Sequence, residues 1–197
     1  MITAVVLAAG KSERMGRPKM LLPFGRKTLI ETVIAGVLRS RVDEVVVVLG
    51  AHREAIESVV SKFELRTVFN PDHGAGMLSS VLRGLREVPA AAQAFLVVLG
   101  DQPSPPASVI DRLIAAHERT GKGVVLPVYR GRRGHPVLID TRYRDDVRAL
   151  DPSIGLRQLS RDHPDDVLEV PVRTPAVLAD IDRPDDYRKA LASRRKR

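Results

Sequence analysis

Residues 1–24 read MITAVVLAAGKSERMGRPKMLLPF, and this stretch decides the fold. The apolar run from Ile2 to Leu7 is typical of a parallel strand that is buried on both faces. The small residues that follow allow backbone N–H groups to approach an anion. Positive charges come next, at Lys11, Arg14, Arg17 and Lys19. A small-residue loop with this charge fits a polyphosphate, so the stretch indicates a nucleotide site.

Strand-like and helix-like segments alternate through the first two thirds of the chain. Apolar runs and helical spacing predict strands at 2–7, 44–49, 65–69, 94–99 and 123–128, and helices at 28–38, 52–63, 77–85 and 108–117. This order is typical of a three-layer α/β fold with a mostly parallel sheet between helices. Ligands of such sheets bind at the carboxyl ends of the strands. We therefore expect the first loop and Asp101, which follows the fourth strand, at the same edge.

The pattern becomes less regular after Tyr129. It predicts strands at 136–139 and 167–172, helical pieces at 147–150 and 156–159, and a final helix at 184–192. No linker or internal repeat divides the chain, so we expect one domain over residues 1–197. Its last third is expected to pack on the sheet as a small accessory lobe. The basic stretch 193–197 is expected to be a frayed, solvated tail.

Composition excludes several classes of protein. The 197 residues contain no cysteine, which rules out disulfide frameworks and thiolate metal sites and suits a cytoplasmic enzyme. No apolar run approaches the ~18–20 residues of a membrane span. The formal net charge of +8 favours an anionic partner such as a nucleotide. A nucleic-acid binder that relies on the basic tail is the alternative, but we expect neither nucleic acid nor a membrane as partner.

Familiar motifs do not fit the first loop. A P-loop needs a glycine five residues before Gly10, where Val5 stands, and the first turn has no G-x-G-x-x-G. The chain also lacks the Gly-x-Ser-x-Gly of serine hydrolases and any pair of histidines with metal-ligand spacing. If the first loop binds phosphate, it is therefore neither a P-loop nor a dinucleotide-binding loop but a third kind of phosphate loop.

Acidic residues near predicted strand ends are candidate metal ligands. Asp101 lies in the sequence Gly-Asp-Gln-Pro after an apolar strand, and Mg²⁺ prefers one or two carboxylates together with substrate phosphates. The alternative for Asp101 is a cap on the following turn. Asp180 and Asp182 point to the same side if their segment is extended, so one of them could complete a metal site. The alternative is a helix N-terminus that simply favours acids.

Two further loops contain candidate substrate contacts. Residues 70–80, with the sequence NPDHGAGMLSS, open a predicted helix and could hold a ribose, a base or a phosphate. An ordinary turn with a helix cap is the alternative. Residues 131–138 form a basic loop that could grip an acidic acceptor. Its His135 is either a direct contact or a structural histidine.

Together these motifs resemble the signature of the MobA-like nucleotidyltransferases. The resemblance rests on LAAGxSxRMGxPK at 7–19, followed in the family's order by GDQP at 100–103, GHPV at 134–137 and DIDxP at 180–184. It implies a Rossmann-like nucleotidyltransferase fold. The paired alanines Ala8 and Ala9 resemble the branch of molybdenum cofactor cytidylyltransferases, whereas the guanylyl branch tends to carry Ala-Gly-Gly. Residues 152–157 read PSIGLR where the family often has GDxGxR, so the acceptor could differ.

The resemblance implies transfer of a nucleotidyl group from a nucleoside triphosphate, with CTP favoured, to the phosphate of molybdenum–molybdopterin, and release of pyrophosphate. A molybdoenzyme or its maturation chaperone is the implied protein partner. The implied catalytic residues are Arg14, Lys19 and Asp101. The implied contacts are Ala8, Ala9, Gly10, Lys11, Ser12, Arg14 and Lys19 to the triphosphate; Leu7, Ala8, Asn70, Gly76, Ser79 and Ser80 to base and ribose; Asp101 and Asp182 to Mg²⁺; and His135 to the acceptor. The alternatives are the same reaction with GTP or another phosphorylated acceptor, and a redox enzyme related to the family.

Overall fold

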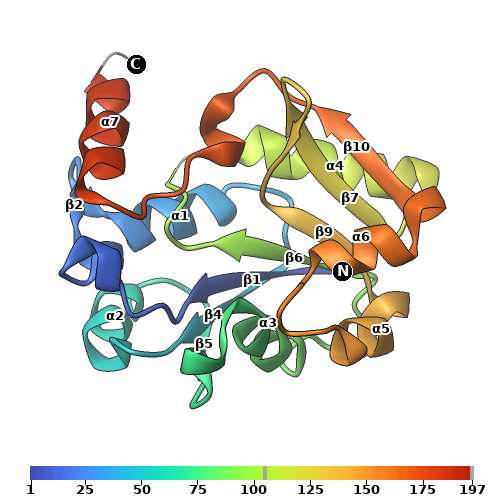
Figure 1. Ribbon diagram of the computed structural model, residues 1–197, viewed down its shortest axis with the longest axis horizontal. Helices are drawn as coiled ribbons and strands as arrows, with labels where there is room; N and C mark the ends of the chain where they lie inside the picture. The colour runs from blue at the N-terminus through green and yellow to red at the C-terminus, as the bar shows by residue number, and fades with distance from the viewer. Residues whose placement is uncertain (104–105, 196–197) are drawn as a thin grey trace.

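A twisted sheet forms the middle of the fold (Figure 1). The computed structural model describes residues 1–103 and 106–195. The strand order is β10-β7-β9-β6-β1-β4-β5, with β8 beside β7, and a separate hairpin pairs β2 with β3. The strands are β1 (Ile2–Ala8), β2 (Pro23–Phe24), β3 (Lys27–Thr28), β4 (Glu44–Leu49), β5 (Arg66–Phe69), β6 (Ala94–Leu99), β7 (Val124–Tyr129), β8 (Arg132–Arg133), β9 (Val137–Asp140) and β10 (Val167–Pro171).

Helices cover both faces of the sheet, as predicted (Figure 1). One face packs against α1 (Leu29–Val37), α2 (Arg53–Val60) and α4 (Ala107–Thr120). The other face packs against α3 (Met77–Leu85), α5 (Arg144–Ala149) and α6 (Arg157–Asp162). The last helix, α7 (Pro184–Arg195), lies apart from these layers beside β2. No helix in the described part of the chain is long and apolar enough to cross a membrane.

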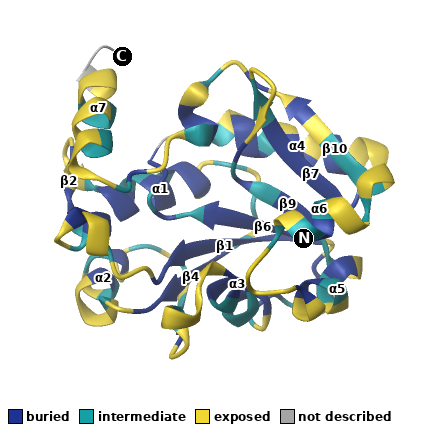
Figure 2. Cartoon of the chain, in the orientation of Figure 1, coloured by how far each residue is buried: buried dark blue, intermediate teal, exposed yellow. Residues whose placement is uncertain are grey.

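Strand β1 lies at the centre because its side chains are apolar on both faces. Ala4 and Val6 contribute to the core under α1 and α4, whereas Val5 and Leu7 contribute to the core under α3. The whole strand is buried between its parallel neighbours β4 and β6 (Figure 2). A strand covered on both faces must be apolar throughout, which explains the run that opens the sequence.

Helix α1 begins at a strong capping box directly after the β2–β3 hairpin. The Thr28 hydroxyl accepts a hydrogen bond from the Glu31 amide at 3.4 Å, and the Glu31 carboxylate accepts one from the Thr28 amide at 2.5 Å. Burial alone would raise the pKa of Glu31, but hydrogen bonds from Lys62 and Thr28 outweigh it and lower the pKa to about 2. The cap therefore fixes the point at which the chain returns from the hairpin to the core.

The last third of the chain contributes more to the sheet than the sequence predicts. Strand β9 lies between β6 and β7 and is antiparallel to both, and β10 extends the sheet parallel to β7. Helices α5 and α6 of this third pack on the same face of the sheet as α3. A short apolar run indicates a strand but not the strands with which it pairs. The position of β9 between β6 and β7 could therefore not be predicted.

The basic tail, for which the sequence predicts a frayed terminus, begins inside a helix. Helix α7 continues to Arg195, and Arg194 donates a hydrogen bond to the Phe24 carbonyl. The last two residues lie outside the described part of the chain, so for them the prediction of fraying stays a prediction.

Candidate functional site

The loop after β1 and the end of β6 meet at one edge of the sheet, as predicted. Leu7 pairs with Leu99 in the parallel ladder, and the Gly100 amide donates to the Leu7 carbonyl at 3.0 Å. A Cβ added at Gly100 would lie 2.6 Å from that carbonyl oxygen, so only glycine allows this approach. The next residue, Asp101, is therefore held against the start of residues 8–19, which we call the phosphate loop after the function that the sequence predicts for it.

The phosphate loop is fixed on its other side by the turn after β4. The Ala51 amide donates to the Ala9 carbonyl at 3.2 Å, and a Cβ at Gly50 would lie 2.4 Å from the same oxygen. His52 Nε2 lies 3.1 Å from the Lys11 carbonyl, which can only accept, so this nitrogen carries the proton. Sequence reasoning missed these residues. The sequence did contain a signal for residues 50–52, because they directly follow a predicted parallel strand and so lie at the edge where ligands bind.

Ser12 turns the loop back toward Lys19. Its φ of 59° lies in the left-handed region, which is uncommon outside glycine and often marks a functional site. The Ser12 hydroxyl accepts from the Lys19 amide at 3.1 Å, and the Ser12 carbonyl accepts from the Met15 amide at 3.0 Å. The polar groups of Ser12 thus fix the path of the backbone from Ser12 to Lys19.

Lys19 is the centre of the site. Its Nζ lies 2.5 Å from Asp101 Oδ2 and 2.9 Å from Asp182 Oδ1, and only 10% of the side chain is exposed. Burial alone would lower the pKa of Lys19, but Asp101 and Asp182 outweigh it and raise the pKa. The ammonium therefore stays charged and joins carboxylates that are far apart in the sequence.

Asp182 also receives a second positive group. Arg14 Nη2 lies 2.9 Å from Asp182 Oδ2, and most of the Arg14 side chain is exposed. Burial alone would raise the pKa of Asp182, but Lys19 and Arg14 outweigh it and lower the pKa. Three separate parts of the chain thus lie together, represented by Arg14 with Lys19, by Asp101 and by Asp182.

Asp180 occupies a different position from Asp182. Gln102 Nε2 donates to Asp180 Oδ1 at 2.5 Å and to the Val177 carbonyl at 3.1 Å. Burial and the nearby charge of Asp101 raise the pKa of Asp180, although the hydrogen bond from Gln102 opposes the shift. Of the two acids that the sequence left open, Asp182 is the one that contacts Lys19.

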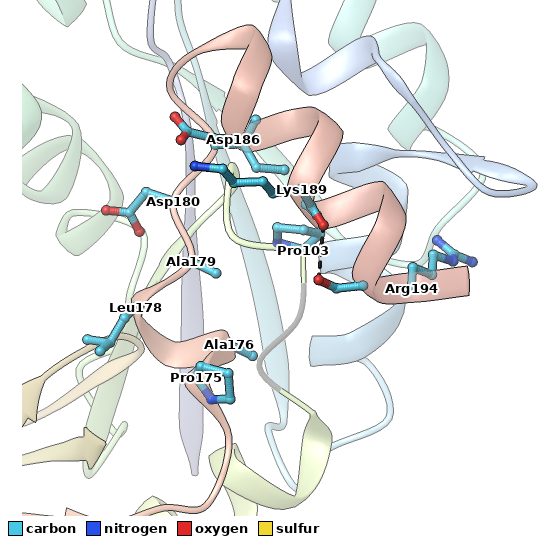
Figure 3. A pocket seen from close by; sticks show the side chains of 12 residues that line it. Pro103, Pro175, Ala176, Leu178, Ala179, Asp180, Asp186, Lys189 and Arg194 are labelled. Atoms are coloured by element: carbon cyan, nitrogen blue, oxygen red, sulfur yellow. Dashed lines mark hydrogen bonds between the residues drawn. The ribbon is translucent and has the colours of Figure 1, made fainter. Parts of the chain in front are cut away.

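A cavity of about 350 Å³ lies beside Asp180, between α7 and residues 175–181 (Figure 3). Its walls are mainly small apolar residues, among them Ala176, Ala179 and Ala190. Asp180, Asp186 and Lys189 provide polar groups at its rim. The cavity therefore separates most of α7 from the segment that leads to Asp182.

The loop before α3 is organised by Asn70. Its Nδ2 donates to the hydroxyls of Ser79 and Ser80, each at 3.0 Å, and its Oδ1 accepts from the Asp72 amide at 3.0 Å. Ser79 in turn donates to the Gly76 carbonyl at 2.8 Å. The structure thus brings Asn70, Gly76, Ser79 and Ser80 together, with Asn70 buried and its amide engaged within the loop.

His135 lies on the accessory side of the same edge. Its amide donates to the Val177 carbonyl at 2.9 Å, and its peptide bond to Pro136 is cis. Burial lowers the pKa of the His135 ring, and Arg157 adds to this whereas Asp101 opposes it. The charges of Asp101 and Arg157 therefore both reach the ring, which is neutral near pH 7.

Among the described residues, no group of three or more His, Cys, Asp or Glu side chains is arranged to hold a metal ion. The structure instead offers two converging carboxylates, Asp101 and Asp182, whose oxygens contact one ammonium. Two carboxylates suit a hard divalent cation that takes its other ligands from phosphate and water. The donor set therefore fits such a cation, with the nucleotide needed to complete the coordination.

Comparison with known proteins finds one family model and relatives with two different activities. The family model of the MobA-like NTP transferase domain matches residues 4–167. The chain is 37% identical over 175 residues to nicotine blue oxidoreductase of Paenarthrobacter nicotinovorans, with 83% of each chain covered. It is 29% identical over 190 residues to the molybdenum cofactor cytidylyltransferase of Escherichia coli K12, with 94% of this chain and 93% of the relative covered.

Solved structures share the whole fold. A protein from Mycobacterium sp. strain JC1 is 31% identical and superposes with a TM-score of 0.88, with 99% of this chain and 97% of that chain covered. A Mycobacterium tuberculosis H37Rv protein solved in complex with manganese is 25% identical, with a TM-score of 0.78 and 98% of both chains covered. These likenesses extend through the C-terminal residues that the family model does not reach.

Proposed function

The chain belongs to the MobA-like NTP transferase family, and from this premise we propose that it transfers CMP from CTP to the phosphate of molybdenum–molybdopterin and releases pyrophosphate. The observation that carries the proposal is the position of Lys19, whose ammonium contacts Asp101 and Asp182 at the edge where the phosphate loop leaves β1. Similarity over nearly the full length to a molybdenum cofactor cytidylyltransferase supports the choice of acceptor.

The phosphate loop is proposed to bind the triphosphate. Backbone amides of residues 8–12, at the end of β1 and in the loop after it, are proposed to bind the phosphates, and Lys11, Arg14 and Lys19 to add positive charge that offsets the phosphate charge. Leu7 and Ala8, with the loop of Gly76, Ser79 and Ser80, are proposed to contact the base and ribose. The internal hydrogen bonds of Asn70 support a role in shaping that loop for the nucleotide.

Asp101 and Asp182 are proposed to hold Mg²⁺, and the relative solved with manganese supports a divalent cation. When bound, the cation supplies charge stabilisation to phosphate oxygens and to the pyrophosphate leaving group. The protein's own contribution is to direct the two carboxylates at one point through Lys19, while Lys19 and Arg14 also lower the pKa of Asp182.

The transfer itself needs little proton chemistry. An acceptor phosphate oxygen attacks the α-phosphorus, the bond between that phosphorus and the bridging oxygen breaks, and pyrophosphate leaves with the electron pair. The acceptor phosphate is already ionised near pH 7, so no strong general base is required. Positioning and charge stabilisation account for the catalysis, and His135 is proposed to face the acceptor.

The test is pyrophosphate release by the purified protein with each nucleoside triphosphate and Mg²⁺, with and without molybdenum–molybdopterin. We expect release with CTP only when the acceptor is present. Release with GTP would move the protein to the guanylyl reaction, and release with another phosphorylated acceptor would change the substrate. No release with any combination would contradict the proposal.

A redox function is the second candidate because the chain is 37% identical to nicotine blue oxidoreductase. Such an enzyme needs a redox cofactor, whereas the first turn carries no dinucleotide fingerprint. Absorption spectra of the purified protein and consumption of NAD(P)H with nicotine blue separate the two functions. A colourless protein that consumes no NAD(P)H excludes the redox candidate.

A further inference from the structure

A small hydrophobic cluster, separate from the main core, connects the two halves of the proposed site. We call it the C-terminal cluster. Its buried members are Met15, Leu22, Phe24, Leu29 and Ile181, and Tyr187, Ala190 and Leu191 of α7 pack against them. Met15 directly follows Arg14, and Ile181 directly precedes Asp182. The cluster therefore joins the backbone on both sides of the Arg14–Asp182 ion pair.

Polar contacts fix α7 to the hairpin that follows Lys19. The Tyr187 hydroxyl donates to the Pro23 carbonyl, and Arg194 donates to the Phe24 carbonyl. The guanidinium of Arg194 also lies 4.9 Å from the centroid of the Phe24 ring. Both carbonyls belong to β2, which begins two residues after the short helical turn Lys19–Leu21.

Asp182 is held from both directions along the chain. On the side of the sheet, the Ile181 amide donates to the Asp101 carbonyl at 3.1 Å. On the side of the helix, Asp186 Oδ2 accepts from the Arg183 amide at 2.9 Å and from the Asp182 amide at 3.3 Å. The position of α7 is thereby transmitted to the Asp182 backbone through a short, hydrogen-bonded connection.

Helix α7 has little support on its remaining side. The cavity of about 350 Å³ separates it from residues 175–180 (Figure 3). The contacts to the hairpin and to Ile181 are therefore the ones that set where α7 lies. A shift of α7 would act on the Asp182 backbone through the hydrogen bonds that Asp186 accepts.

We infer that α7 is a positioning element of the nucleotidyltransferase site. In this role Tyr187 connects the β2–β3 hairpin, which follows Lys19, to the segment that contains Asp182. This inference rests on the proposed function for its consequence in catalysis. It concerns residues beyond 167, where the family model ends. Tyr187 acts through Lys19 and Asp182 and is a positioning residue, because the hydroxyl is engaged with Pro23.

The experiment compares Tyr187→Phe with a matched control on the next position of the helix. Tyr187→Phe removes the hydroxyl and keeps the ring in the C-terminal cluster. In the control, Arg188→Ala, the lost guanidinium is exposed and pairs with Asp185 inside α7. Hydrogen exchange of the full chain reports the backbone without any requirement for turnover. Electron paramagnetic resonance measures Mn²⁺ binding in the presence of CTP.

We expect Tyr187→Phe to speed exchange in the peptides over 15–24 and 180–186 and to weaken Mn²⁺ binding, each by roughly fivefold, the effect of one lost hydrogen bond. Saturating Mn²⁺ should restore the rate of transfer, so the Mn²⁺ requirement rises while kcat is kept. Arg188→Ala should leave all three readouts at wild-type values.

The inference is overturned if exchange in both segments and Mn²⁺ affinity are unchanged in Tyr187→Phe, or if Arg188→Ala produces the same changes. Its failure differs from failure of the proposed function. Wild-type protein that releases no pyrophosphate contradicts the function, and the exchange comparison still decides whether Tyr187 couples the two segments.

Discussion

The two halves of the site are held in different ways. The phosphate loop, residues 8–19, is braced by backbone contacts from the turns after β4 and β6, which leave no space for a side chain at Gly50 or Gly100. The segment 175–195 depends on side-chain contacts of α7 and borders a cavity. The Asp101 side chain is 19% exposed, whereas that of Asp182 is 33% exposed. The phosphate loop is therefore held by backbone contacts with the sheet, whereas the segment 175–195 is held mainly by side-chain contacts of α7.

This difference has a consequence for catalysis. Asp101 follows a central strand whose end is held by the backbone bond from the Gly100 amide to the Leu7 carbonyl, so its backbone position depends on the sheet itself. A carboxylate before an edge helix keeps its position only while a few side chains stay in contact. We therefore expect substitutions in the first half to reduce the reaction more than equivalent substitutions in the second.

The largest effect is expected from Asp101→Asn, which keeps the shape of the side chain and removes its charge. Pyrophosphate release should fall by at least ~10²-fold, because charge stabilisation by a bound cation contributes several kcal/mol. Initial rates with CTP and the acceptor measure it. Asp185→Asn, on the exposed face of α7, is the control. A rate within a few-fold of wild type would remove Asp101 from the metal site.

A slightly smaller loss is expected from Lys19→Ala, which separates the two halves by deleting the ammonium between them. We expect KM for CTP to rise and overall transfer to slow by about 10²-fold, since a preorganised cationic group is lost. Lys19→Arg should not restore the rate, because a planar guanidinium does not replace a compact ammonium in a space that leaves 10% of the side chain exposed. Lys27→Ala, an exposed change in β3, serves as control. Normal kinetics in Lys19→Ala would exclude the residue from the site.

Gly50→Ala tests the rigid half of the comparison. The added Cβ would meet the Ala9 carbonyl oxygen at 2.4 Å, so the phosphate loop must shift. We expect a loss of roughly 1–3 kcal/mol in the free energy of unfolding, together with a higher KM for CTP. Gly74→Ala is the matched control, because its Cβ would meet only the end of the Lys11 side chain at 3.8 Å. Equal stability of the two variants would show that the loop is not tightly braced.

The smallest effect concerns acid stability and the segment 175–195. Lys19 and Arg14 hold the pKa of Asp182 below its usual 3.8 despite burial. A lowered folded-state pKa means that this pairing stabilises the fold above pH 3.8 and that the stabilisation is lost as the pH falls further. Since Asp182 is partly exposed, we expect less than about 1 kcal/mol. Urea unfolding of wild type and Asp182→Asn should differ near pH 6 and converge in acid. If the difference in unfolding free energy between the two proteins grew in acid, the predicted sign of the pH dependence would be wrong.

The sequence predicts the rigid half well because its signals are local. The apolar run of β1 predicts a strand buried on both faces, and the register of parallel strands then brings the loop after it and Asp101 to one edge. The family signature at 7–19 also predicts that the loop binds phosphate, which stays a prediction. The prediction of a three-layer fold with a mostly parallel sheet is confirmed for the same reason.

What the sequence could not provide depends on contacts between distant residues. The insertion of β9 between β6 and β7, the bond from His52 to Lys11 and the pairing of Tyr187 with Pro23 leave no local pattern. The choice between Asp180 and Asp182 was open because both fit an extended segment, and it depended on Gln102, which engages Asp180.

The most direct test of the account is whether Asp101 and Asp182 act on one cation. Mn²⁺ affinity in the presence of CTP is measured by electron paramagnetic resonance for wild type, Asp101→Asn, Asp182→Asn and the double variant. We predict that each single variant binds Mn²⁺ more weakly than wild type. The double variant should bind Mn²⁺ almost as well as Asp101→Asn, because losses of affinity from two ligands of one ion do not add. Wild-type affinity in Asp182→Asn, or strictly additive losses, would contradict a single site shared by the two halves.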